Sequence, residues 1–238
     1  ALYGMRPERQ MPLESYVGFM LFKNGLAVSY GGAWVLGPRA NFGMNIFEPY
    51  RGGESGYMMC QVLRAYRQTF GVDFFEVDAH QFGLDNADGI ASGAFWFYHR
   101  HGFRPLDAEL AALAGREAAL NQRKLGRRSS ERTLLKFTGS NVALNFGGVV
   151  PPSVDELCMA VTAWVARHHQ GDRVAAERDA LQRLATASGA VGSAPAAEQR
   201  ALSEVALLAQ ALQVSDMAQW QLLRRMARAK PQDLAAYQ

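Results

Sequence analysis

Residues 45–66 read NIFEPYRGGESGYMMCQVLRAY and are the most informative part of the chain. A short apolar strand at 41–48 runs into a glycine-rich turn at 51–56, and a helix at about 55–70 follows directly. The start of a helix has backbone N–H groups without partners and the positive end of the helix dipole, so it attracts anions. Glycine also lets the backbone come close to a bound phosphate. The stretch predicts an anion-binding turn, although many strand-to-helix turns carry glycines for steric reasons alone.

The segments on either side predict strands that place this turn in a sheet. Apolar runs at 15–22 and 26–36 flank Lys23-Asn24-Gly25, and Asn-Gly between such runs indicates a β-hairpin. Gly71 after the helix is typical of a helix C-terminus, and the apolar segment 73–79 follows as a strand. A strand, a helix and a strand in this order predict a parallel pair with a right-handed crossover.

The rest of the chain divides at Pro151-Pro152. Before that point the pattern predicts, in chain order, a loop at 80–90, a helix at 91–101, a short strand at 103–106, a helix at 107–128 and two strands within 133–148. After it, Ser153 and Glu156 form a capping box that opens helical sequence at 154–187, and a small-residue linker at 188–197 leads to helical sequence at 197–229. We therefore expect an α/β (α+β) fold, with a mixed central sheet and flanking helices at 1–150 and an all-helical region at 152–238.

Composition limits the class of protein. Apolar residues make up 49% of the 238 residues and charged residues 20%, which is typical of a globular chain. No run of about 18 uncharged apolar residues exists, so we expect no membrane span. Cys60 and Cys158 are far apart, which indicates a reduced compartment, hence a cytoplasmic protein, and neither a disulfide framework nor a metal site. The net charge of +3 suits a small anionic ligand.

A second segment, AFWFYHRHGF at 94–103, adds to the glycine turn. Together they resemble the GNAT superfamily of acyl-CoA N-acyltransferases. In that family a strand enters a Q/R-x-x-G-x-G/A turn and a helix, and after another strand comes a helix reading roughly A-x-x-F-Y-x-x-x-G-F. The resemblance covers about residues 15–106. It implies a GNAT-like, acyl-CoA-binding domain at 1–150, with acetyl-CoA or another acyl-CoA as co-substrate.

The resemblance also implies roles for particular residues. Arg51 would begin the loop that holds the coenzyme A pyrophosphate, and the pantetheine arm would pair with the strand before it. The backbone groups assigned to the pyrophosphate are those of Gly52, Gly53, Ser55, Gly56 and Tyr57, and those assigned to pantetheine are Asn45, Ile46 and Phe47.

Tyr98 would protonate the leaving thiolate, because a tyrosine with a pKa near 10 keeps its proton at neutral pH. The base that takes a proton from the amine would be Glu48 or a chain of water molecules. The implied reaction moves an acetyl or acyl group to an amine by direct attack of the amine on the thioester.

Two other functions remain open. Glu54 stands where the family pattern has a glycine, which favours a catalytically inactive GNAT-like scaffold or partner-binding module. The basic segment 116–136 favours a binder of nucleic acid, of a carrier protein or of the 3′-phosphate of coenzyme A. It has no interleaved aromatic residues for base stacking, so nucleic acid is the weaker of these, and a solvated helix face is the ordinary explanation. The helices at 154–187 and 197–229 could pair with each other and with those of a second copy in a homodimer.

Overall fold

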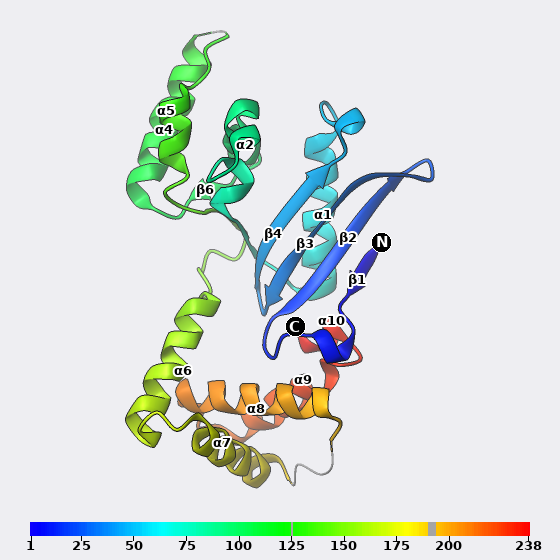
Figure 1. Ribbon diagram of the computed structural model, residues 1–238, viewed down its shortest axis with the longest axis vertical. Helices are drawn as coiled ribbons and strands as arrows, with labels where there is room; N and C mark the ends of the chain where they lie inside the picture. Colours follow the sequence, from blue (N-terminus) through cyan, green and yellow to red (C-terminus); the bar gives the residue numbers. More distant parts are fainter. Residues whose placement is uncertain (125, 190–193) are drawn as a thin grey trace.

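The computed structural model describes residues 1–124, 126–189 and 194–238. Within them, one mixed sheet lies between two groups of helices (Figure 1). The strands are β1 (Leu2–Gly4), β2 (Ser15–Lys23), β3 (Leu26–Leu36), β4 (Arg39–Ile46), β5 (Phe74–Val77), β6 (Arg104–Pro105) and β7 (Val142–Asn145). The fold is therefore mixed α/β, as the sequence predicts.

Helices connect the strands and form the whole of the C-terminal region. Those up to residue 150 are α1 (Ser55–Phe70), α2 (Ala87–Ser92), α3 (Ala94–Arg100), α4 (Ala108–Arg123) and α5 (Glu131–Phe137), with the 3-10 helices η1 (Pro7–Arg9), η2 (Glu48–Tyr50) and η3 (Ala79–Phe82). The C-terminal helices are α6 (Val154–His169), α7 (Arg173–Ser188), α8 (Ala196–Ala211), α9 (Met217–Ala229) and α10 (Leu234–Tyr237). In the described ranges, no helix combines the length and the apolar character that a bilayer crossing requires.

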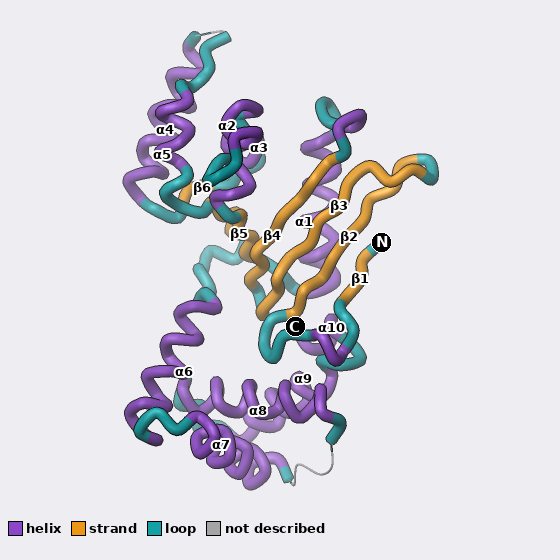
Figure 2. Tube along the Cα trace, viewed as in Figure 1, coloured by secondary structure: helices purple, strands orange, loops and turns teal. Residues whose placement is uncertain are grey.

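The sheet has the strand order β1-β2-β3-β4-β5-β7-β6. Only β4 and β5 run parallel, and every other neighbouring pair is antiparallel. Apolar side chains that alternate along the strands, such as Phe19, Val35 and Phe42, share one buried core with Val62 and Tyr66 of α1. Helix α1 therefore covers one face of the sheet (Figure 2).

Several local predictions are confirmed. The β2–β3 hairpin turns at Asn24 and Gly25, both of which have positive φ angles, as an Asn-Gly turn requires. Helix α1 ends at Gly71, whose φ angle is 69° and whose N–H donates to the carbonyl oxygen of Arg67. The capping box at Ser153 is also present, with both reciprocal hydrogen bonds.

The predicted pair of strands within 133–148 is wrong. Its first half is helix α5, and only its second half is a strand, β7. Ser130 caps α5 by accepting a hydrogen bond from the N–H of Thr133, and Leu134 and Phe137 are buried at helical spacing. The predicted loop at 80–90 likewise contains η3 and the start of α2, and the helix predicted at 91–101 is divided at Gly93, whose φ angle is 66°. The N-terminal strand β1 was not predicted.

The C-terminal helices have a core of their own around Ala176, Leu184 and Trp220, and they also contact the sheet region. The side chain of Lys230 donates to the carbonyl oxygens of Leu13 and Glu14, which immediately precede β2. Leu13 packs against this C-terminal core and Leu234 against the sheet core, so the two cores are connected by apolar as well as polar contacts. The domain boundary near residue 151 stays a prediction. The linker predicted at 188–197 lies partly outside the described residues.

Candidate functional site

The glycine turn connects the end of β4 to the start of α1. Gly52 has a φ angle of 131°, which an L-residue with a side chain rarely adopts, and its N–H donates to Oγ of Ser55 over 3.0 Å. The N–H of Ser55 donates in return to the carbonyl oxygen of Gly52. An added Cβ at Gly52 or Gly53 would meet no atom within 4 Å, so the turn opens toward solvent.

The first turn of α1 has free hydrogen-bond donors. Among the described residues, the backbone N–H groups of Gly53, Glu54, Gly56 and Tyr57 donate to no protein acceptor. They stand at the positive end of a 16-residue helix. The turn therefore has the donors and the open space that an anion needs.

The two charged side chains of the turn have partners within the protein. Nε of Arg51 donates to the carbonyl oxygen of Ile46 at 3.0 Å, so this side chain folds back on β4. The carboxylate of Glu54 forms an exposed ion pair with Lys23 at 2.5 Å. This pair draws Glu54 toward the β2–β3 hairpin and neutralises its charge beside the turn.

Strands β4 and β5 separate early. They pair only at Arg39 with Phe74, Ala40 with Phe75 and Asn41 with Glu76, while β4 continues to Ile46. Beyond that point β5 leads away toward α2 and α3 (Figure 2).

One side chain from η3 lies near the gap that this separation leaves. An added Cβ at Gly43 of β4 would lie 3.6 Å from the side-chain amide of Gln81.

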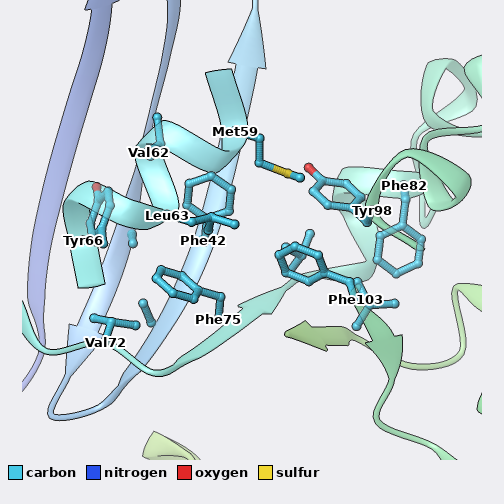
Figure 3. Packing of buried hydrophobic residues seen from close by; sticks show 14 of the residues in the cluster. Phe42, Met59, Val62, Leu63, Tyr66, Val72, Phe75, Phe82, Tyr98 and Phe103 are labelled. Atoms are coloured by element: carbon cyan, nitrogen blue, oxygen red, sulfur yellow. The ribbon is translucent and has the colours of Figure 1, made fainter. Parts of the chain in front are cut away.

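Tyr98 belongs to α3, which comes after β5, and it faces α1, which comes after β4 (Figure 3). Its side chain is 5% exposed and packs against Phe82, Phe97 and Phe103. Its hydroxyl group points toward Met59 on α1 (Figure 3) and forms no hydrogen bond with the described residues. Burial raises the pKa of Tyr98 above its ordinary value, so the phenol keeps its proton at neutral pH.

His101 brings α3 against the turn, a contact that the sequence analysis did not anticipate. Nδ1 of His101 lies 2.7 Å from the carbonyl oxygen of Phe97, which assigns the proton to Nδ1 and leaves Nε2 as an acceptor. Any Cβ at Gly56 would collide with Nε2 of His101. Gly56 therefore allows the close approach of the two helices, and the aromatic-histidine pattern at 94–103 was the available signal.

The other predicted residues surround the end of β4. Asn45 and Phe47 are exposed, and their backbones bond toward β3, through Ser29 Oγ and the carbonyl oxygen of Val28. Tyr57 is 68% exposed on the first turn of α1. Glu48 is exposed in η2 and follows β4, so it lies at the same end of the strand as the glycine turn.

On the face of the sheet opposite α1, Glu76 is the centre of a polar network that the sequence analysis did not predict. Its carboxylate accepts from Arg39 at 2.5 and 3.1 Å and from the amide of Asn141 at 2.8 Å. Arg39 also donates to the carbonyl oxygen of Pro151. The only sequence signal was a carboxylate within the apolar strand FFEV.

Two cavities in the described part of the chain lie near the sheet and the helices of the site. The larger has a volume of about 1470 Å³ and lies between α2–α3 and α4–α5, where Arg100, Arg104 and Arg128 line it. The smaller, of about 410 Å³, includes Trp34, Asn41 and Glu76 on the face of the sheet opposite α1. Neither cavity is lined by the glycine turn, which is an open surface feature.

Comparisons of the chain with family models, with curated proteins and with solved structures find no match.

Proposed function

We propose that the chain is an acyl-CoA-dependent N-acyltransferase that moves an acetyl or another acyl group to an amine. The observation that supports this most is the position of Tyr98. Its side chain is 5% exposed, its hydroxyl group points toward α1, and it belongs to a helix that follows the strand splayed away from β4. A phenol hydroxyl that forms no hydrogen bond within the described residues can donate its proton to a ligand.

In the proposed reaction the amine nitrogen attacks the thioester carbonyl carbon, and the carbon–sulfur bond breaks as the tetrahedral intermediate collapses. The thiolate takes the proton of Tyr98, and the proton from the amine passes to Glu48 or to water. General acid assistance of this kind contributes about 10²–10⁴ in rate. Backbone N–H groups of β4 would stabilise the oxyanion.

The cofactor would lie across the glycine turn. The free N–H groups of Gly53, Glu54, Gly56 and Tyr57 would accept the pyrophosphate, and the Lys23–Glu54 ion pair reduces the repulsion from the nearby carboxylate. Arg51 is exposed, so its guanidinium can leave Ile46 and turn to a phosphate.

Calorimetry with acetyl-CoA tests the cofactor site. We expect binding to the wild type and about tenfold weaker binding to Arg51→Ala, because one charge-assisted contact is lost. The matched control is Arg178→Ala, an exposed arginine on α7. Absence of binding to the wild type would favour the inactive scaffold, and equal binding by both variants would remove Arg51 from the site.

Turnover tests Tyr98 separately. We expect Tyr98→Phe to retain acetyl-CoA binding and to lose about 10²-fold or more in kcat. Tyr3→Phe, which removes a hydroxyl group from a half-exposed tyrosine on β1, is the control. An unchanged kcat in Tyr98→Phe would exclude the acid role.

A second candidate function depends on the larger cavity. Arg100, Arg104 and Arg128 make it a site for an anionic partner, and Arg128 belongs to the basic segment 116–136. If this segment binds a polyanion, affinity for a labelled oligonucleotide will fall steeply with salt and will fall further in Arg128→Ala than in Arg178→Ala.

A further inference from the structure

The smaller cavity lies at the point where β4 and β5 begin to separate. Its floor is a row across the sheet, because Trp34 on β3 is the register partner of Asn41 on β4, and Asn41 is the partner of Glu76 on β5. Asn41 and Glu76 form the last pair before the strands separate. The cavity is therefore on the other side of the sheet from Tyr98, beside the same gap.

Carboxylates come to this cavity from three parts of the chain. Glu14 comes from the segment before β2, Asp78 from the end of β5, and Asp155 from the first turn of α6. Glu76 also lines the cavity, but its charge is balanced by the one guanidinium there, that of Arg39. Asp78 and Asp155 add negative charge to the cavity, while the charge of Glu14 is partly offset by the nearby Lys230.

The carboxylates of Glu14 and Asp155 have no hydrogen-bond partner among the described residues, and neither forms an ion pair there. Burial raises the pKa of Glu14, the nearby charge of Lys230 lowers it, and the charge of Asp155 raises it. Lys230 is close to Glu14, but its ammonium group donates to two backbone carbonyls and to Ser15. A cation between the two carboxylates would relieve their repulsion.

An aromatic wall stands beside these carboxylates. The ring of Trp34 lies 5.0 Å from the ring of Tyr16, with an angle of 57° between the planes. Within the described residues, neither ring has a protein cation over its face, because the cation–π contacts involve Phe74, Phe146 and Tyr237. Indole faces and carboxylates together are the groups that recognise organic ammonium ions.

The described residues contain no cluster of three ligand side chains that could hold a metal ion, so an organic cation suits the cavity better. A volume of about 410 Å³ is within the usual range for a small-molecule site.

We propose that this cavity binds the acyl acceptor and that the acceptor is a linear diamine or polyamine. One ammonium group lies between Glu14 and Asp155, the alkyl chain follows Trp34, and the second, uncharged amine points past Asn41 toward the separation of the strands. This inference rests on the proposed acyltransferase function for its catalytic meaning, while the binding itself is independent of it.

Calorimetry without acyl-CoA tests the binding, with cadaverine as the probe and pentylamine as its analogue lacking the second ammonium group. We expect cadaverine to bind at least tenfold more tightly than pentylamine.

Asp155→Asn and Trp34→Leu should each weaken cadaverine binding by about threefold to tenfold. Glu109→Gln, which also removes an exposed first-turn carboxylate but on α4, should leave it unchanged. Equal binding of the two amines, or equal effects of Asp155→Asn and Glu109→Gln, would overturn the proposal.

Turnover then separates this inference from the proposed function. If cadaverine binds as expected but no acyl transfer occurs, the acyltransferase proposal fails and the amine site stands. If acetyl-CoA is consumed with pentylamine as efficiently as with cadaverine, and Trp34→Leu leaves KM unchanged, the acyltransferase stands and the diamine site fails. A higher KM for cadaverine in Trp34→Leu, with kcat retained, supports both.

Discussion

The two faces of the sheet around β4 and β5 have opposite chemistry. The face toward α1 is filled with apolar side chains, among them Phe42 and Phe75, which are almost completely buried. The other face presents Trp34, Asn41 and Glu76 in one row, with a cavity above them. Two residues that follow each other in β5, Phe75 and Glu76, belong to different faces and have different neighbours.

The packed face therefore stabilises the fold, and the open face has the polar groups suited to recognition. Close packing on the α1 face leaves no room for a ligand except where the strands separate, and it stabilises the fold through burial. The opposite face keeps polar groups in fixed positions through hydrogen bonds, and it leaves part of its charge without partners. Variants on each side should therefore differ in the property that they change.

The largest effect is expected for Phe75→Ala on the packed face. Removing a fully buried aromatic ring leaves a cavity, which lowers the free energy of unfolding by about 3–5 kcal/mol. Asn41 lies on the neighbouring strand β4 and is exposed on the other face. Asn41→Ala should therefore change the free energy of unfolding by less than about 0.5 kcal/mol. Urea denaturation measures both, and similar losses in the two variants would contradict the contrast.

A slightly smaller effect is expected for Glu76→Gln. The substitution leaves Arg39 buried without its counter-charge, and breaking a buried pair in this way costs about 3 kcal/mol. The matched variant is Glu117→Gln, which breaks the more exposed pair with Arg127 and should cost clearly less. If the two variants unfold at the same urea concentration, the Glu76 network does not stabilise the open face.

A third effect, spread over several pH units, is a pH dependence from Lys230, which is buried close to Glu14. Burial lowers the pKa of Lys230 to about 7, below the usual value of about 10.4 in an unfolded chain. Above pH 7 the unfolded chain binds more protons at this residue than the folded one, so stability rises with pH from about 7 to 10 and is lost as pH falls through 7. The slope should be at most about 1.4 kcal/mol per pH unit.

Lys230→Met provides the control for this slope. Its curve of unfolding free energy against pH should be flatter than that of the wild type over the same interval. Parallel curves for the two proteins would show that Lys230 keeps an ordinary pKa in the fold.

The fold was predictable where local signals determine it. The Asn-Gly hairpin, the helix at Ser55–Phe70 and its glycine end each depend on a few adjacent residues, and all three are confirmed. The segment at 133–148 was not predictable in this way, because its apolar residues suit a strand as well as a helix. Packing of Phe137 against Phe95, with ring centres 4.0 Å apart, favours the helix.

The candidate site divides in the same manner. The glycine turn and Tyr98 could be singled out because each lies in a compact motif, while their functional roles stay predictions. The Arg39–Glu76–Asn141 network could not, since its members come from positions up to 102 residues apart and meet only through the sheet. The same holds for Glu14 and Asp155, which come from opposite parts of the chain.

The contact of His101 with Gly56 has a mechanical consequence. Because the imidazole lies against the backbone of α1, a tilt of α3 toward α1 would press on the start of that helix and on the glycine turn. The proposed proton donor and the proposed anchor for the cofactor are therefore coupled through one imidazole. We expect an opening that admits a thioester to come from the strands and from η3.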